Sequence, residues 1–221
     1  MDQDLTALAS SRDRTLADLL PAGPIVPVIT LERVEDAVPL ARALVAGGLR
    51  LLEITLRTPA AADSAAAIIR EVPEAIVGIG TVLTPKDLER AQALGARYAL
   101  SPGATPDLLQ AASRSAMPFI PGIATASELM AALAHGFQTV KFFPAAASGG
   151  IPALKALAGP FPQARFCPTG GIDEKNVKDW LALPNVVAAG GSWICSTSDI
   201  RAQAWDQITT KAQQAVAAAR G

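Results

Sequence analysis

The sequence contains little histidine and cysteine. Its 221 residues include one histidine, His135, and two cysteines, Cys167 and Cys195. One histidine cannot form a multi-histidine zinc site, and a Ser-His-Asp or Cys-His mechanism would depend on His135, which is expected to cap the end of a helix. We therefore expect no metal centre and no cofactor. Two cysteines without a secretory signature predict free thiols, with a packing role, in a reducing, cytoplasmic compartment.

Excess charge is also missing, because 19 basic and 20 acidic residues give a formal net charge of -1 at pH 7. No block of like charge is present that would neutralise a row of phosphates or bind an anionic bilayer. Residues 1–20 contain four aspartates and lack the apolar stretch of a signal peptide or a membrane span. We expect neither a nucleic-acid partner nor a membrane partner.

Half of the residues are hydrophobic, and short β-branched runs alternate with longer segments rich in Ala and Leu. The runs predict eight strands, at residues 25–29, 49–55, 75–82, 98–101, 119–123, 139–143, 165–169 and 186–190. The segments between them predict helices at residues 32–46, 59–70, 84–94, 105–115, 125–134, 151–158 and 173–183. Strand starts are separated by roughly 20 to 26 residues, the length of one strand, one crossover helix and two short loops.

Eight such units predict an α/β fold, a (β/α)8 TIM barrel with an extra N-terminal helix. The chain is expected to form a single domain over residues 1–221, with the N-terminal helix at 1–20, barrel strands and helices at 24–194 and a C-terminal helix at 200–221. A doubly wound open sheet is the alternative. It is disfavoured because Gly78-Ile79-Gly80 lacks the third glycine of a dinucleotide fingerprint.

Lys141 differs from the other five lysines because it lies inside an apolar run, Thr139 to Pro144, that predicts a buried strand. If Val140 and Phe142 pack outward against helices, alternation directs Lys141 into the barrel. Desolvation there disfavours the ammonium form, and the uncharged amine is the form that attacks a carbonyl to make a Schiff base. A structural lysine paired with a carboxylate is the competing interpretation.

A carboxylate and a guanidinium lie in a second apolar run. Alternation places Glu53, Thr55 and Arg57 on one face of the run Leu49 to Arg57, near the strand ends where barrel enzymes hold their active sites. Glu53 is a candidate general acid and base beside the lysine. Arg57 is a candidate for holding a substrate carboxylate through two hydrogen bonds. A Glu53–Lys141 or Glu53–Arg57 ion pair that only fills the barrel is the alternative.

Glycines and hydroxyl residues follow several predicted strands. Gly80-Thr81 and Ser101-Pro102-Gly103 follow the third and fourth strands, where each either lets a ligand approach the backbone or forms an ordinary turn. The pairs Gly170-Gly171 and Gly190-Gly191, the latter followed by Ser192, stand in the seventh and eighth strand-to-helix loops. These loops frequently form the phosphate site of a barrel, because glycine lets backbone N–H groups converge on an anion.

Taken together, these segments resemble the 2-keto-3-deoxy-6-phosphogluconate (KDPG) aldolase family, which also includes 4-hydroxy-2-oxoglutarate (KHG) aldolases. The segments that carry the resemblance are Pro24 to Ile29, Glu53 to Thr58, Gly78 to Leu83, Ser101 to Gly103, Lys141 to Ala145, Arg165 to Ile172 and Gly190 to Trp193. The resemblance implies a class I, Schiff-base aldolase, a (β/α)8 barrel and a homotrimer. Its expected partners are pyruvate and a phosphosugar acid.

The resemblance also implies a role for each matching residue. Lys141 would form the Schiff base with pyruvate, and Glu53 would move protons during carbinolamine dehydration and cleavage of the carbon-carbon bond. The implied substrate-binding residues are Arg57 and Thr81 for the pyruvyl carboxylate, Pro102 and Phe143, and Thr169 for a hydroxyl group. The implied phosphate-binding residues are Gly170, Gly171, Gly191 and Ser192. Thr169 favours the gluconate over the galactonate substrate.

The expected reaction is cleavage of KDPG to pyruvate and glyceraldehyde 3-phosphate, together with cleavage of KHG to pyruvate and glyoxylate. Two other hypotheses remain open from the residues themselves. One is a barrel isomerase or phosphosugar synthase that uses Glu53 as its base, with Lys141 acting only through its charge. The other is a non-catalytic protein that binds a phosphate ligand and keeps the Glu53–Lys141 pair as a structural contact.

Overall fold

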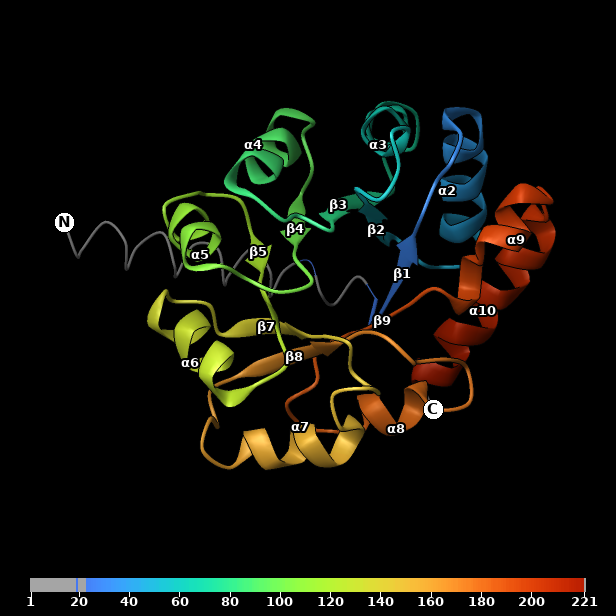
Figure 1. Cartoon of the computed structure of the whole chain (residues 1–221). Helices are drawn as coiled ribbons and strands as arrows, with labels where there is room; N and C mark the ends of the chain where they lie inside the picture. The colour runs from blue at the N-terminus through green and yellow to red at the C-terminus, as the bar shows by residue number, and fades with distance from the viewer. Residues whose placement is uncertain (1–18, 20–22, 221) are drawn as a thin grey trace.

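The computed structural model describes Leu19 and residues 23–220. Short parallel strands meet in the middle of the molecule, and the helices lie outside them (Figure 1). The strands are β1 (Ile25–Ile29), β2 (Leu51–Thr55), β3 (Ile76–Gly80), β4 (Tyr98–Leu100), β5 (Phe119–Ile120), β6 (Gly122–Ile123), β7 (Thr139–Phe142), β8 (Arg165–Pro168) and β9 (Ala189–Gly191). The chain therefore has an α/β fold built on parallel strands. The helix expected at 1–20 lies outside the described residues, apart from Leu19, whose side chain is buried.

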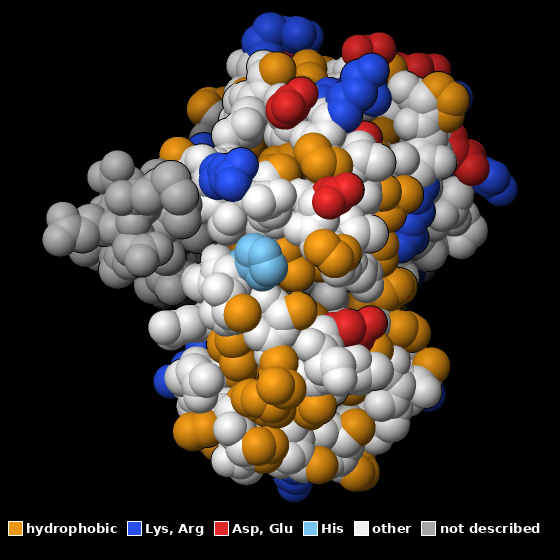
Figure 2. Space-filling view, turned by 60° about the vertical axis from the view of Figure 1, so that its left-hand side comes forward, with side chains coloured by type: hydrophobic (Ala, Val, Ile, Leu, Met, Phe, Trp, Pro, Cys, Tyr) orange, Lys and Arg blue, Asp and Glu red, His pale blue; other side chains and the backbone are white. Residues whose placement is uncertain are grey.

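The helices follow the strands along the chain, as the spacing predicted. They are η2 (Val34–Asp36), α2 (Ala37–Ala46), α3 (Ala61–Glu71), α4 (Pro85–Ala93), α5 (Pro106–Ser113), α6 (Ala126–Ala134), α7 (Gly150–Ala158), α8 (Val177–Leu181), η3 (Trp193–Cys195), α9 (Thr197–Arg201) and α10 (Trp205–Arg220). None of the described helices is both long enough and apolar enough to cross a bilayer. The molecular face in Figure 2 carries side chains of both charges in its upper part and a gathering of hydrophobic side chains below.

The strands form two parallel sheets, with the orders β5-β4-β3-β2-β1-β9 and β6-β7-β8. The strand expected at 119–123 is divided at Pro121, so that β5 pairs with β4 and β6 pairs with β7. Proline has no N–H to donate to a sheet, which explains the change of partner at this residue. Two isolated parallel bridges, Phe166 with Val186 and Thr169 with Gly190, connect the β8 segment to the β9 segment.

Side chains of the strands pack in two separate apolar layers. Leu52 and Ile54 of β2 belong to a large cluster that includes the inner faces of the helices, whereas Leu51 belongs to a small cluster on the opposite face of the strands. Val140 and Phe142 of β7 are fully buried in the large cluster. The expectation that these two side chains pack outward is confirmed, and Lys141, the residue between them, faces the interior.

Capping residues explain where several helices begin and end. Thr84 and Thr125 form capping boxes with Asp87 and Glu128, each accepting a backbone hydrogen bond at the start of α4 or α6. His135 ends α6, and its Nδ1 lies 2.9 Å from the carbonyl oxygen of Ala131. The predicted role of His135 as a helix cap is therefore confirmed.

Two helix predictions need correction. The single C-terminal helix expected at 200–221 is instead α9 and α10, because the backbone of Gln203 adopts a left-handed conformation with φ of 51° and separates them. The helix expected at 173–183 begins only at Val177. Asp173 accepts backbone hydrogen bonds from Lys175 and Asn176, and this local turn replaces the first helical turn.

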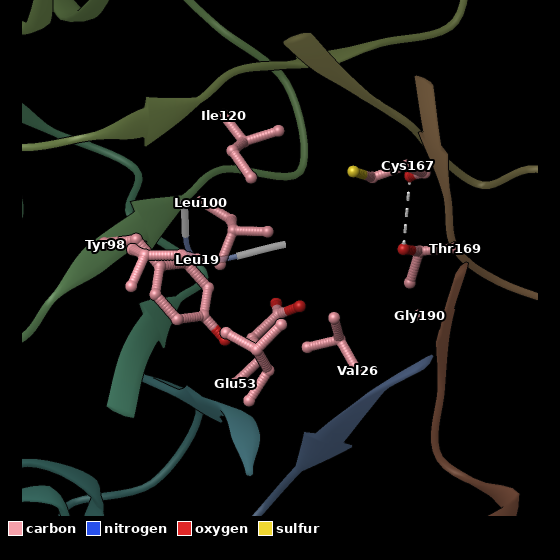
Figure 3. Close-up of a pocket in the computed structure, with 10 residues that line it drawn as sticks. Leu19, Val26, Glu53, Tyr98, Leu100, Ile120, Cys167, Thr169 and Gly190 are labelled. Atoms are coloured by element: carbon pink, nitrogen blue, oxygen red, sulfur yellow. Dashed lines mark hydrogen bonds between the residues drawn. The ribbon is translucent and has the colours of Figure 1, made fainter. Parts of the chain in front are cut away.

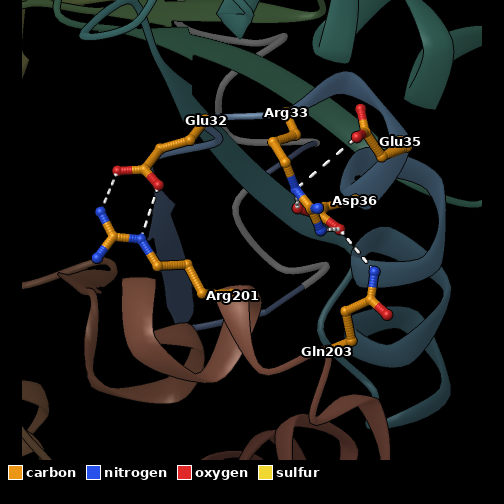
Figure 4. A network of polar contacts seen from close by, with 6 residues as sticks. All are labelled: Glu32, Arg33, Glu35, Asp36, Arg201 and Gln203. Carbon is orange, nitrogen blue, oxygen red and sulfur yellow. Dashed lines mark hydrogen bonds and ion pairs between the residues drawn. The ribbon is translucent and has the colours of Figure 1, made fainter.

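A polar network ties the loop after β1 to the C-terminal helices (Figure 4). Asp36 is 2% exposed and accepts two hydrogen bonds from Arg33, at 2.7 and 2.9 Å, and a third from Gln203 at 3.3 Å. Arg201 forms a two-point ion pair with Glu32 across the same junction. The hydrogen bonds from Arg33 hold the pKa of Asp36 below its usual value, although burial alone would raise it.

The Asp36→Asn variant is expected to lower the free energy of unfolding by about 1–3 kcal/mol at pH 7, because it places an amide where Arg33 needs an acceptor. The depressed pKa makes this contribution fully present above about pH 4 and causes its loss as the pH falls through the folded-state value. Urea unfolding between pH 3 and pH 7 measures both effects. Glu35→Gln, which removes an exposed partner of the same arginine, is the control and should change stability by less than about 0.5 kcal/mol. Equal stability of wild type and Asp36→Asn at pH 7 would contradict the prediction.

Candidate active site

A buried ion pair lies between β2 and β7. Lys141 Nζ donates a hydrogen bond to Glu53 Oε1 over 2.7 Å, although the two residues are 88 positions apart. Lys141 is 3% exposed and Glu53 is 1% exposed. Removing two charges from water costs several kcal/mol per ion, a cost that close pairing offsets and that side chains used only for packing do not incur. The two residues that the sequence analysis selected from separate strands are therefore in direct contact.

An aromatic ring and a thiol are neighbours of Lys141. Its Nζ lies 5.5 Å from the centre of the Phe143 ring, which is half-buried at the end of β7. Cys167 is the neighbour of Lys141 across the β7–β8 pair, and burial raises the pKa of its thiol to about 12. The thiol is thus protonated at neutral pH and is not a nucleophile, in agreement with its expected packing role.

Glycine makes room for the Glu53 carboxylate. Gly80 ends β3 beside Thr55, and a Cβ added at this position would overlap Glu53 Oε1 and crowd the rest of the carboxylate. Thr55 is fully buried and donates a hydrogen bond to the carbonyl of Ile29 over 2.9 Å. This bond fixes the end of β2 against β1, two residues beyond Glu53.

Arg57 lies beyond the end of β2, outside the alternation that was expected to place it beside Glu53. The strand β2 ends at Thr55, so its alternation stops two residues before Arg57, which is exposed. Within the part of the chain that the structure describes, the ion pair of Glu53 is with Lys141 rather than with Arg57. The alternative of a Glu53–Arg57 bridge is therefore wrong, and a role for Arg57 in substrate binding stays a prediction.

Thr81 and Pro102 occupy the loops after β3 and β4, and both are half-buried. Thr81 has a φ of 61°, a conformation that a β-branched residue rarely adopts and that costs of the order of 1–3 kcal/mol. Pro102 lies against Gly122, where an added Cβ would overlap the carbonyl of the proline. Ser101, which sequence reasoning did not assign a role, is fully buried and accepts the N–H of Gly122 over 3.1 Å.

The two predicted phosphate loops are neighbours. Thr169 is 6% exposed and forms a parallel bridge with Gly190. Gly170 and Gly171 therefore follow one strand where Gly191 ends β9 and Ser192 follows it. Gly170 and Gly171 have φ values of 100° and 75°, which suit glycine. A Cβ on Gly191 would overlap the Trp193 ring, and Ser192 is exposed at the start of η3.

Comparison with known proteins agrees with this arrangement. The family model described as "KDPG and KHG aldolase" matches residues 16–211. The KHG/KDPG aldolase of Escherichia coli K12 is 53% identical over 202 residues, covering 91% of this chain and 95% of the relative. The 2-dehydro-3-deoxy-phosphogluconate aldolase of Pseudoalteromonas atlantica is 52% identical, with coverage of 92% and 95%.

Solved structures agree with the sequence comparison. A KDPG aldolase from Legionella pneumophila, with pyruvate captured as a covalent carbinolamine, is 49% identical with a TM-score of 0.87, covering 89% of this chain and 96% of the other. A KDPG aldolase of Zymomonas mobilis is 43% identical with a TM-score of 0.84, covering 91% and 95%. The chain therefore belongs to the KDPG and KHG aldolase family, and its activity is that of an aldehyde-lyase.

Replacing Gly80 by Ala is expected to lower KDPG cleavage about a hundredfold, the cost of misplacing a reacting group by about 1 Å. The added Cβ forces the Glu53 carboxylate away from Lys141 Nζ. Steady-state rates, with circular dichroism as a check on folding, measure the effect. Gly159→Ala is the control, since its Cβ would meet only the carbonyl of Ala156 at 3.8 Å. Wild-type activity in Gly80→Ala would show that the ion pair is not needed in this geometry.

Proposed function

We propose that this protein cleaves KDPG to pyruvate and glyceraldehyde 3-phosphate through a Schiff base on Lys141, and that it also cleaves KHG to pyruvate and glyoxylate. The observation that carries the proposal is the 2.7 Å contact between two almost fully buried groups, an amine and a carboxylate, in a chain of this family. The amine is the nucleophile of such a reaction, and the carboxylate is its proton carrier.

The first half of the reaction forms the imine. Lys141 Nζ passes a proton to Glu53 and attacks the C2 carbonyl carbon as the free amine. A second Nζ proton moves to the carbonyl oxygen, and the resulting carbinolamine loses its hydroxyl group as water after Glu53 returns its proton. The pair supports this step because one hydrogen bond already connects the two groups, so the proton moves over a short distance. The Legionella pneumophila relative, in which pyruvate is captured as a carbinolamine, supports the same intermediate here.

The second half breaks the bond between C3 and C4. Glu53 accepts the proton of the C4 hydroxyl, the aldehyde departs, and the bonding electrons move to the protonated imine, which becomes an enamine. Protonation of the enamine at C3 and addition of water to the imine release pyruvate and restore the amine of Lys141. Every proton in this cycle passes between substrate, water, Lys141 and Glu53.

The proposed binding residues surround the pair on the loops that follow the strands. Arg57 and Thr81 hold the carboxylate of the pyruvyl group, Pro102 and Phe143 contact its carbon chain, and Thr169 contacts a hydroxyl group. Gly170, Gly171, Gly191 and Ser192 hold the phosphate, a role supported by the bridge between Thr169 and Gly190 that makes their loops neighbours. Binding energy at the phosphate, far from the bond that breaks, then serves to position the reacting atoms.

The remaining expectations concern architecture and assembly. We propose that the parallel strands close into a single (β/α)8 barrel, which the division of 119–123 at Pro121 and the two bridges from β8 to β9 support. We also propose a cytoplasmic homotrimer, which rests on the resemblance to the family.

Lys141→Ala is expected to lower turnover of KDPG at least about a thousandfold, because no other group replaces the amine. Leaving the Glu53 carboxylate buried without its partner costs about 3–5 kcal/mol, so thermal melting accompanies the assay. The double variant Lys141→Met, Glu53→Gln removes both charges and should be inactive yet more stable than Lys141→Ala. Lys155→Ala, on the exposed side of α7, is the control. Substantial turnover by folded Lys141→Ala would refute the mechanism.

Ser192→Ala is expected to raise KM for KDPG about tenfold, the effect of losing one hydrogen bond to a charged group. KHG carries no phosphate, so its kinetic constants should change by less than about twofold. Steady-state kinetics with both substrates on the same preparation provide an internal control. An equal change for the two substrates would place the phosphate elsewhere.

A further inference from the structure

A small cavity lies inside the ring of strands, beside the Lys141–Glu53 pair (Figure 3). Its walls are mostly apolar and include Leu51, Leu100 and Ile120, with Glu53 among the few polar lining groups. The volume open to the centre of a water molecule is about 20 Å³. A cavity needs roughly 10–15 Å³ by this measure to hold one water molecule, so there is room for one.

Tyr98 places a hydroxyl group at this cavity, and the hydrogen-bonding capacity of that group is unused by the residues that the structure describes. The side chain is 3% exposed, and Tyr98 Oη has no hydrogen-bond partner among the described residues. A buried polar atom without a partner costs about 1–3 kcal/mol, and buried polar groups are normally paired with protein or with an ordered water molecule. The hydroxyl therefore indicates a ligand that is able to accept a hydrogen bond.

The strand register directs this hydroxyl toward Glu53. Glu53, Gly78 and Tyr98 stand side by side on β2, β3 and β4. A Cβ on Gly78 would overlap the Tyr98 ring, so the ring occupies the space that a side chain on β3 would take. The hydroxyl end of the ring consequently points across β3 toward Glu53 (Figure 3).

The electrostatics of the cavity fix which group donates. Burial, together with the nearby Glu53 carboxylate, raises the pKa of Tyr98 well above its usual value. The phenol thus keeps its proton at neutral pH and acts as a donor. A carboxylate has about four lone-pair sites, so Glu53 is able to accept a further hydrogen bond in addition to the one from Lys141.

We propose that one buried water molecule joins Tyr98 Oη to the Glu53 carboxylate and that Tyr98 is thereby a positioning residue for proton transfer. Tyr98 donates to the water molecule, and the water molecule donates to Glu53, which holds the carboxylate in place from the side opposite the substrate. The proposal rests on the proposed function, in which Glu53 moves protons at the Schiff base. It assigns Tyr98 no contact with the substrate.

Tyr98→Phe tests the proposal because it keeps the ring and removes only the hydroxyl. The Schiff base with pyruvate loses a C3 proton to Glu53 when it becomes the enamine, so NMR of pyruvate in D2O measures this step as exchange of the methyl protons. We expect exchange at saturating pyruvate to fall about tenfold, while the fraction of Lys141 trapped by pyruvate and borohydride and the KM for pyruvate stay unchanged. Ser64→Ala is the matched control. It deletes a fully buried hydroxyl on α3 that also lacks a partner within the described part of the chain and should leave exchange unchanged.

Unchanged exchange in Tyr98→Phe would overturn the proposal. A parallel loss of exchange and trapping would also overturn it, because it would show a disturbed Lys141 rather than a displaced Glu53. A high-resolution crystal structure provides the independent measurement: we expect one ordered water molecule within hydrogen-bond distance of Tyr98 Oη and Glu53, and a dry cavity would contradict it. Absence of trapping in the wild type would instead contradict the proposed function, and the crystallographic water would still decide the contact.

Discussion

The architecture of the site depends on one interaction, the buried hydrogen-bonded ion pair between Lys141 and Glu53. Parallel strands place two distant parts of the chain side by side, and their alternation turns both charged groups inward while Val140 and Ile54 pack against the helices. Within the described residues these groups satisfy each other at 2.7 Å. In the proposed mechanism, a substrate that enters replaces this contact with its own polar groups, which couples binding to activation of the amine.

Glycines on β3 are as important to the site as the ion pair itself. Gly80 leaves space for the carboxylate, and Gly78 leaves space for the ring of Tyr98. Two alternate positions on one face of β3 thus determine what surrounds Glu53 on two sides. The strained backbone of Thr81, which follows directly, marks the point where this strand leaves the interior. The segment Gly78 to Thr81 consequently shapes the space around Glu53 without contributing a charged group.

The sequence predicted those features that depend on local pattern. Alternation identified Lys141 and Glu53 as inward-facing, and the Gly-Gly pairs identified the neighbouring loops. Other features depend on tertiary contacts that no local pattern carries. Examples are the division of one strand at Pro121, the break between α9 and α10 at Gln203 and the exposure of Arg57 beyond the end of β2. The approach of Tyr98 to Glu53 is of the same kind, because it follows from the register of three strands.

The measurement that tests the account most directly is intact-mass and peptide mass spectrometry after incubation with pyruvate and borohydride. The account predicts a mass increase of one reduced pyruvate, confined to the peptide that contains Lys141 and absent both without pyruvate and in Lys141→Ala. No adduct on folded protein, or an adduct on another lysine, would contradict it. In either case the buried pair would be a structural contact, and the absence of any adduct would favour an isomerase or a binding protein.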